Sequence, residues 1–218
     1  MSGTQPDAGP GWQLRPAGPA DADALRTFLT GLSLRTRYLR FFAGVLPVTP
    51  SFLSRMTGTR TARGEVVDAL VVTEPAATPG PAPGPETVIG HGMATDTRDD
   101  TGRPVTELAV VVADERRGRG AGSGLMRALT ARAQARGATT LLFDVLAENR
   151  EMLALIAHYF PVARYARSGP YTTITVQIPS TQVPSVQEEP AREPAISLSR
   201  GCVPGPRRGG TPADLPVG

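Results

Sequence analysis

The pattern of apolar positions along the chain predicts seven β-strands. Short apolar runs, or apolar residues alternating with polar ones, mark these strands, and Gly- and Pro-rich stretches separate several of them. The run from Leu108 to Ala113 is apolar at every position, which is typical of a central strand covered on both faces. The predicted strands lie within residues 12–16, 64–75, 86–97, 105–115 and 139–149, and within a hairpin over residues 162–178.

Apolar residues at helical spacing predict five helices between these strands. Leu25, Phe28 and Leu29 mark the buried face of the first helix. The second and third helices follow Ser33 and Thr49, whose hydroxyl groups suit them to cap a helix N-terminus. The helical patterns cover residues 18–32, 33–42, 49–58, 120–137 and 148–160. The second helix is expected to bury one apolar side, which consists of Leu34, Tyr38, Phe41 and Phe42.

Residues 1–11 and 179–218 lack these patterns. Both segments are rich in Gly, Pro and polar residues, and no aromatic residue follows Tyr171. Such segments cannot bury enough apolar surface to offset the entropy of ordering them, so we expect both to be disordered. The sequence therefore predicts one folded domain over residues 12–178, between a disordered N-terminus and a disordered Pro/Gly-rich tail.

Composition excludes several classes of function. All 23 basic side chains are arginines, the net charge is only +3, and the sequence has no basic stripe with interleaved aromatic residues, so nucleic-acid binding is not expected. The single cysteine, Cys202, excludes an intramolecular disulfide, and two histidines are too few for a zinc site, so no metal is expected. The sequence also lacks a membrane span and a signal-peptide pattern. We expect a cytoplasmic protein from a bacterium with a GC-rich genome, which would explain the abundance of Ala, Gly, Pro and Arg.

A glycine-rich loop follows the fourth predicted strand, in the sequence RRGRGAGSGLM of residues 116–126. A strand, a glycine-rich loop and a helix in this order can hold phosphate groups on backbone N–H groups at the helix N-terminus. The loop is not that of a P-loop nucleotidase, because that motif requires a lysine and the chain has none. A dinucleotide fingerprint also fits poorly, since Leu125 stands where the third glycine is needed and the loop does not follow the first strand.

Residues 117–122 instead have the form R/Q-x-x-G-x-G/A, and they resemble the acyl-CoA pyrophosphate loop of the GNAT acetyltransferases. The stretch ELAVVVADERRGRGAGSGLMRALTARAQARGATTLLFDVLAENREML is similar to that family from the fourth strand to the last helix. The opening LRPAGPADADALRTFLTGLSLRTRYLRFF is similar to a bacterial subgroup that includes lysine acetyltransferases of proteins. The resemblance covers roughly residues Gln13 to Ile178. It implies an α/β (α+β) fold with three αβα layers around a mixed, mostly antiparallel sheet of six or seven strands, in which the fourth and fifth strands splay apart.

The same resemblance implies which residues hold acetyl-CoA. The alternating glycines let the loop backbone come close to a pyrophosphate, and two arginines add positive charge. In this family the fourth strand holds the pantetheine arm through backbone groups, and Asn149 stands at the position of a polar contact to the cofactor. For Asn149, a plain structural role at a helix N-terminus is the alternative. The implied cofactor-binding residues are Val110, Val111, Val112, Arg117, Gly118, Arg119, Gly120, Ala121, Gly122, Ser123 and Asn149.

Glu107 is the expected catalytic base. An amine acceptor has an unperturbed pKa of about 10.4, so at neutral pH it must lose a proton before it can attack a thioester. Glu107 begins the fourth strand, where the protein-acetylating subgroup carries its catalytic glutamate; the alternative is a solvated glutamate at a strand end. Asp144 and Glu148 are weaker candidates for the base. Ile156 stands where many GNAT enzymes have a tyrosine as general acid, so the acid is unassigned. Cys202 lies in the tail, so we expect direct transfer in a ternary complex.

Three functions fit these residues. The first is an acetyl-CoA-dependent N-acetyltransferase that acts on a primary amine, for which a protein lysine is one candidate. The second is a non-catalytic GNAT-fold module that binds CoA or a metabolite and regulates a partner. The third, acetylation of a small molecule as in aminoglycoside resistance, would predict an acidic acceptor pocket. The presence of Glu107 together with a complete glycine-rich loop favours an enzyme over the non-catalytic module. In this fold a helical segment typically lines the acceptor side, and here it contains Tyr38, Arg40, Phe41 and Phe42. For Phe41 and Phe42, packing in the core is the favoured alternative.

Overall fold

A computed structural model describes residues 11–58, 67–75 and 86–179 of the chain. These residues belong to the first of two units into which the chain divides, Met1–Val183 and Pro184–Gly218. The expected disordered ends (residues 1–10 and 180–218), Cys202, residues 64–66 and the Pro/Gly-rich bridge at residues 76–85 lie outside the described residues. In the part of the chain that is described, no helix is long and apolar enough to cross a membrane.

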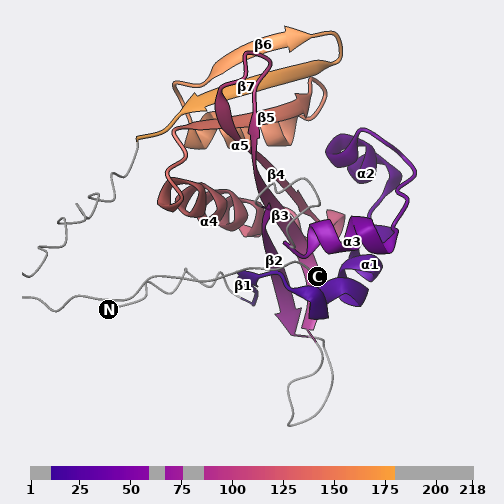
Figure 1. The fold of residues 1–218 in the computed structure, drawn as a ribbon. Helices are drawn as coiled ribbons and strands as arrows, with labels where there is room; N and C mark the ends of the chain where they lie inside the picture. The colour runs from indigo at the N-terminus through magenta and orange to yellow at the C-terminus, as the bar shows by residue number, and fades with distance from the viewer. Residues whose placement is uncertain (1–10, 59–66, 76–85, 180–218) are drawn as a thin grey trace, which may run out of the picture. The chain divides into compact units, whose positions relative to one another are not determined.

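Seven strands form one sheet in the order β1-β2-β3-β4-β5-β7-β6 (Figure 1). Every neighbouring pair is antiparallel except β4 and β5, which are parallel. The number of strands and the mostly antiparallel sheet that the sequence predicts are therefore confirmed. The strands are β1 (Gln13–Pro16), β2 (Val67–Pro75), β3 (Glu86–Arg98), β4 (Pro104–Val112), β5 (Thr140–Leu146), β6 (Arg164–Ser168) and β7 (Tyr171–Gln177).

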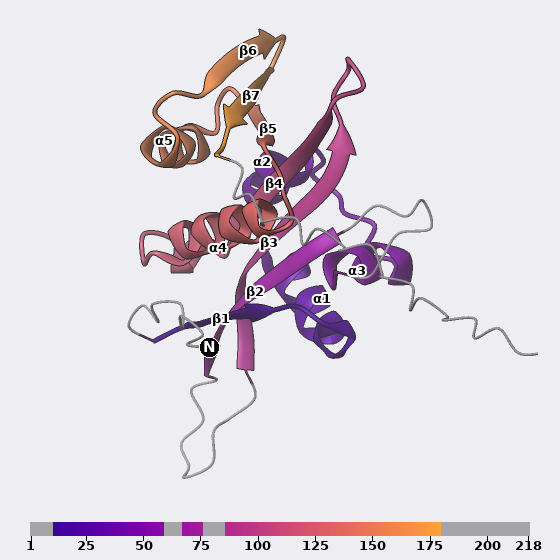
Figure 2. The same cartoon turned by 60° about the vertical axis from the view of Figure 1, so that its left-hand side comes forward.

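The two central strands, β4 and β5, touch over a short length only. Their register contains two residue pairs, Thr106 with Leu141 and Glu107 with Leu142. β4 continues to Val112 and stays paired with β3 over its whole length, whereas β5 pairs with β7 from Thr140 to Leu146. From Leu108 onward the backbone of β4 therefore has no strand partner on the side of β5, and the strands can be followed apart in Figure 2. This is the splayed pair that the resemblance implies.

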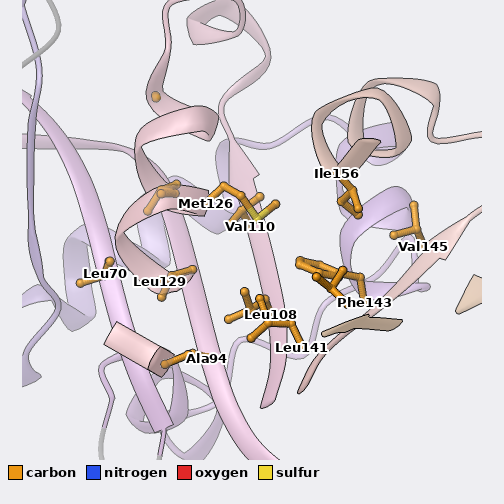
Figure 3. Close-up of a cluster of buried hydrophobic side chains, with 14 of the residues drawn as sticks. Leu70, Ala94, Leu108, Val110, Met126, Leu129, Leu141, Phe143, Val145 and Ile156 are labelled. Carbon is orange, nitrogen blue, oxygen red and sulfur yellow. The ribbon is translucent and has the colours of Figure 1, made fainter. Parts of the chain in front are cut away.

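Helices cover both faces of the sheet. One buried cluster joins the strands to α4 and α5 through Met126, Leu129 and Ile156 (Figure 3), and a second cluster joins them to α1 and α3. Adjacent residues of β4 belong to different clusters, because successive side chains of a strand point to opposite faces. The fold is the three-layer αβα arrangement of the GNAT proteins. The helices are α1 (Ala22–Gly31), α2 (Leu34–Phe41), α3 (Pro50–Met56), α4 (Ala121–Ala135) and α5 (Arg150–Tyr159), with short 3-10 turns at Pro19–Asp21 and Asp114–Arg116.

The expected apolar side of α2 is wrong in part. Leu34, Tyr38 and Phe42 are 65%, 41% and 38% exposed, and among the four residues expected to be buried only Phe41 packs on a core. The buried residue of α2 is Thr36, which hydrogen-bonds to Asp114. The physical reason is the position of α2. This helix contacts β4 and β5, where the strands diverge, so its inner face meets polar groups and a cavity.

His91 is a fully buried titratable residue of β3. Its side chain has no exposed surface, and its Nε2 lies 2.8 Å from the carbonyl oxygen of Met56. Burial lowers the pKa of His91 from 6.5 to about 4, since the charged imidazolium would lose its hydration; the Met56 carbonyl opposes this shift and the nearby Arg40 charge adds to it. The imidazole is therefore neutral at pH 7 and is a part of the core.

Because the pKa of His91 is lower in the folded state, acid is expected to destabilise the protein through this residue. Between pH 6.5 and pH 4 the unfolded chain binds a proton that the folded chain excludes, so this contribution to stability is complete above pH 6.5 and is lost as the pH falls. A shift of this size corresponds to about 3 kcal/mol. Urea unfolding at pH 7 and pH 4 should show that His91→Gln loses about that much less stability on acidification than the wild type. Equal losses in both proteins would contradict the assignment.

Candidate active site

The glycine-rich loop turns through two residues in the left-handed region of backbone conformation. Gly118 has a φ of 72° and Gly120 a φ of 84°, values at which a side chain would be strained. Gly120 is the N-cap of α4 and offers no side chain to the first turn of the helix. In the described part of the chain, Gly124 N–H is satisfied by the Gly120 carbonyl, whereas no protein partner is found for the N–H groups of residues 121–123. These groups form the positive end of α4.

A cavity of about 450 Å³ lies between this loop, the open stretch of β4, β5, α5 and α2. Its floor follows the gap between β4 and β5, and its walls contain side chains from segments far apart in the sequence. Of the residues expected at the site, only Arg119 does not line it. The expected residues that line the cavity are Glu107, Val110, Val111, Val112, Arg117, Gly118, Gly120, Ala121, Gly122, Ser123 and Asn149.

The free edge of β4 points into this gap. The N–H of Ala113 donates to the carbonyl of Ile89 in β3, at 2.8 Å. Backbone groups along an antiparallel pair alternate between the two sides of a strand, so those of Val110 and Val112 point away from β3 and toward the gap. β5 does not pair with either residue. The strand therefore offers donors and acceptors to an extended molecule that lies beside it.

Glu107 lies where the two strands part. It is paired with Leu142 of β5 in the last of the two register pairs, and its side chain is exposed in the cavity. Asp144 lines the same cavity and accepts a hydrogen bond of 2.7 Å from the Thr173 hydroxyl. The cavity thus contains two carboxylates on the side of the sheet where α2 lies.

Arg40 of α2 faces the same cavity and interacts electrostatically with Glu107. Burial lowers the pKa of Arg40 to about 10, because a buried guanidinium loses hydration, and the Glu107 carboxylate opposes this shift. Arg40 is still charged at pH 7. Its guanidinium carbon also lies 4.7 Å from the centre of the Phe41 ring, a cation–π distance.

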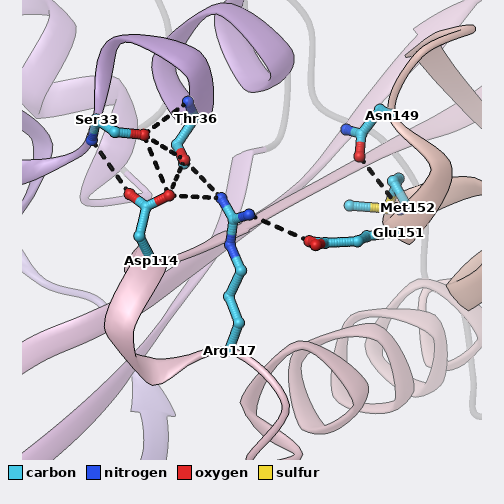
Figure 4. Close-up of polar contacts among 7 residues, drawn as sticks. All are labelled: Ser33, Thr36, Asp114, Arg117, Asn149, Glu151 and Met152. Atoms are coloured by element: carbon cyan, nitrogen blue, oxygen red, sulfur yellow. Dashed lines mark hydrogen bonds and ion pairs between the residues drawn. The ribbon is translucent and has the colours of Figure 1, made fainter.

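Arg117 is held in a polar network that connects the loop to α2 and α5 (Figure 4). Its guanidinium lies 3.1 Å from Asp114 and 3.2 Å from Glu151, and it also donates to the hydroxyl of Thr36. Partial burial acts to raise the pKa of Asp114, but hydrogen bonds from Thr36 and Ser33 and the Arg117 charge outweigh it and hold that pKa below its ordinary value. The network fixes the entrance of the loop against two helices.

Arg119 and Asn149 make protein contacts as well. The Arg119 side chain is exposed, and its guanidinium lies 4.0 Å from Glu74 of β2. Asn149 caps α5, since its side-chain oxygen accepts a hydrogen bond of 3.2 Å from the N–H of Met152. The structural alternative for Asn149 is thus present, and its amide NH₂ group has no protein partner among the described residues, which leaves it available to a ligand.

Ile156, at the position of the tyrosine that many GNAT enzymes have, is fully buried in the core. Tyr159 packs against His158 and Phe160 and does not line the cavity. In the described part of the chain, the cavity therefore has no tyrosine in its wall. The described residues also contain no group of three His, Cys, Asp or Glu side chains that could hold a metal ion.

Trp12 packs against the glycine-rich loop and the start of α4. The sequence did not predict this role. Its indole Nε1 donates to the carbonyl of Arg119 at 3.0 Å, and its ring is 6% exposed. The ring also lies against α4, where a Cβ added to Gly124 would come within 2.8 Å of it. The contact joins residues 107 positions apart, and the only signal in the sequence is that a single tryptophan starts the first strand.

Replacing Trp12 with phenylalanine should lower the free energy of unfolding by roughly 1–3 kcal/mol, because the hydrogen bond to Arg119 is lost and the ring no longer fills its space. Urea unfolding measures this loss. Gly124→Ala should destabilise the wild type, in which the new methyl meets the indole, and should be less harmful in the Trp12→Phe background. Additive effects of the two substitutions would show that the indole does not pack on Gly124.

The family comparison matches the centre of the domain. Residues 68–160 match the model of the acetyltransferase (GNAT) family. No curated protein matches the chain. The match spans β2 to the end of α5, which includes the loop, the gap and every residue expected at the site.

Solved structures with the same fold extend the comparison to most of the chain. The GNAT domain of PAT from S. lividans has a TM-score of 0.59 and 22% identity, covering 76% of this chain and 89% of that one. The putative acetyltransferase yncA from Salmonella typhimurium, solved with its cofactor acetyl-CoA, has a TM-score of 0.59 and 17% identity, covering 81% and 99%. The ribosomal-protein-alanine N-acetyltransferase from Brucella melitensis has a TM-score of 0.53 and 21% identity, covering 76% and 99%. The GNAT family model thus covers residues 68–160, and these solved structures share the fold of the chain.

Proposed function

We propose that this protein is an N-acetyltransferase that transfers the acetyl group of acetyl-CoA to a primary amine, in a ternary complex, with Glu107 as the general base. The observation that carries the proposal is that one cavity joins a phosphate-binding type of loop, an unpaired strand edge and a carboxylate. A lysine side chain of a protein is the acceptor that the resemblance favours. The acetyl-CoA in the yncA structure supports the choice of donor.

The glycine-rich loop and the gap between β4 and β5 fit two parts of acetyl-CoA, its pyrophosphate and its pantetheine arm. The N–H groups of residues 119–123, at the positive end of α4, would receive the pyrophosphate oxygens, and Gly118 and Gly120 allow the turn that brings them together. The backbone groups of Val110 and Val112 would pair with the amide groups of the pantetheine arm, as a neighbouring strand would. Val111 lies between them, with its side chain in the opposite core. The amide of Asn149 would bind the donor from the start of α5.

Glu107 would then take a proton from the acceptor. The ammonium form of an amine cannot attack a carbonyl carbon, so the carboxylate removes a proton, directly or through one water, before the new C–N bond forms. When bound, acetyl-CoA would supply the thioester carbonyl, and the C–S bond would break with the electron pair leaving on sulfur. The second proton, which the nitrogen loses as the amide forms, would pass to the thiolate or to water. A thiol has a pKa of about 8.5 and its thiolate leaves readily, so the cavity can act without a tyrosine as acid.

The proposed function is tested by mixing the protein with acetyl-CoA and a panel of amines, lysine peptides and proteins, and measuring CoA release. Because the sequence contains no lysine, any acetyl-lysine that forms in the mixture belongs to the acceptor. Release of CoA that depends on the acceptor supports the enzyme. If acetyl-CoA protects the protein from heat but no acceptor is acetylated, the alternative of a CoA-binding regulatory module is supported instead.

A further inference from the structure

A second cavity, of about 570 Å³, adjoins the first one. It lies between α2, the segment that connects β5 to α5, and β6. Leu39, Arg117, Asn149 and Glu151 line both cavities, so the second one opens next to the first. Of the glycine-rich loop, residues 116–126, Arg117 alone lines the second cavity. Apart from Arg117, the wall of the second cavity therefore comes from segments outside the glycine-rich loop.

The second cavity is lined by an excess of positive charge. Its charged side chains are four arginines and two glutamates: Arg35, Arg117, Arg150, Arg167, Glu148 and Glu151. Arg117 and Glu151 are paired with each other, and Arg117 is also paired with Asp114. Two of the six charges are thus neutralised within the protein, and the first turn of α5 adds the positive end of a helix to the wall.

Three arginines of this cavity form no side-chain ion pair with another described residue. Arg35 comes from α2, Arg150 from the first position of α5 and Arg167 from β6. None of the three forms an ion pair or a hydrogen bond with another described residue through its side chain, and all three are exposed. The fold brings together three guanidinium groups from separate elements, with Glu148 as the single remaining carboxylate in the wall. Guanidinium groups in such a cluster bind carboxylate and phosphate oxygens in pairs.

We propose that this second cavity binds an anionic group of the acceptor, so that the enzyme selects amines that carry a carboxylate or phosphate close to the reacting nitrogen. The inference rests on the proposed function, because it assigns the acceptor side of the same site. It favours lysines that lie beside acidic residues over polycationic acceptors of the aminoglycoside kind. The anionic group would lie among Arg35, Arg150 and Arg167 while the amine reaches Glu107 past Leu39.

The test compares lysine peptides of one length whose neighbouring residues are acidic, neutral or basic. The wild type should acetylate the acidic peptide with a kcat/KM roughly tenfold above that of the neutral one, which corresponds to about 0.7 kcal/mol from each of two exposed arginines. The double variant Arg35→Gln/Arg167→Gln should lose this preference through KM. Arg164→Gln is the matched control, since Arg164 lies exposed on the same strand as Arg167 but lines neither cavity, and it should keep the preference.

A binding measurement separates failure of this inference from failure of the proposed function. Fluorescence anisotropy of the same peptides, labelled and mixed with the protein and CoA, reports the acidic preference without any turnover. A preference that is present in the wild type and lost in the double variant supports the cavity even if no peptide is acetylated. Equal binding of all peptides overturns it. The inference is also overturned if the double variant raises the KM for acetyl-CoA but not for acetyl-dephospho-CoA, because the cavity would then serve the 3′-phosphate of the donor.

Discussion

Replacing Glu107 with glutamine should lower kcat/KM for an amine acceptor by roughly 10²–10⁴-fold at neutral pH, while acetyl-CoA still binds. Glutamine keeps the shape of the side chain but cannot accept the proton that the acceptor must lose. Glu107 stands at the last register pair of β4 and β5, away from the loop, so its replacement leaves the donor cradle intact. CoA release measures the activity, and the melting temperature with and without acetyl-CoA measures binding.

The pH dependence of the two proteins provides a further check. As the pH approaches the pKa of the acceptor, about 10.4 for a lysine, a growing fraction of the amine is already deprotonated and needs no base. The ratio of the wild-type rate to the Glu107→Gln rate should therefore shrink as the pH rises. Asp144→Asn is the matched control, because Asp144 is the other carboxylate on this side of the cavity and is held by Thr173. If Asp144→Asn is the more damaging substitution, the base is Asp144.

Gly122→Val should abolish the protection that acetyl-CoA gives against heat. Gly122 lies in the first turn of α4, and a Cβ there would make ordinary contacts, 3.8 Å from Val112 and 3.9 Å from Leu155. One methyl group therefore fits, whereas the two further methyl groups of valine fill the space in front of the N–H groups that would receive the pyrophosphate. A ligand at 100 times its Kd stabilises a folded protein by about 2.7 kcal/mol, and the valine variant should lose this stabilisation.

Gly122→Ala is the control for this loop experiment. The alanine variant should keep most of the protection, because its Cβ meets only the far ends of Val112 and Leu155. Both variants should melt near the wild-type temperature without ligand, since the position lies inside a helix with an ordinary backbone conformation. Normal protection by acetyl-CoA in the valine variant would show that the donor does not lie on this turn.

Local patterns predicted the elements well, because strand and helix periodicity and end signals are properties of neighbouring residues. Ser33 and Thr49 cap α2 and α3, as expected, and the loop lies between a strand and a helix. The buried side of α2 was predicted wrongly because periodicity shows which residues are apolar but not what the helix meets. Here it meets a cavity and Asp114 instead of a core.

Contacts between distant segments could not be predicted from the sequence. Trp12 and Arg119 are 107 residues apart, and Thr36 and Arg117 are 81 residues apart. Neither pair has a spacing or a motif that would connect its members. The arginines of the second cavity are a similar case, since in the sequence they are three among many scattered basic residues. Only the folded chain brings them to one place.

The short contact between β4 and β5 divides the cooperative structure of the domain. Backbone hydrogen bonding is continuous from β1 to β4 and from β5 to β6, but only two residue pairs connect these two halves. Side-chain packing of Leu108 and Val110 near Phe143 and Val145 adds to this connection (Figure 3), as does the ion pair between Arg117 and Glu151. A donor that lies in the gap as an extra strand would join the two halves. The stability of the fold, seen by hydrogen exchange, would then follow the acetyl-CoA level of the cell.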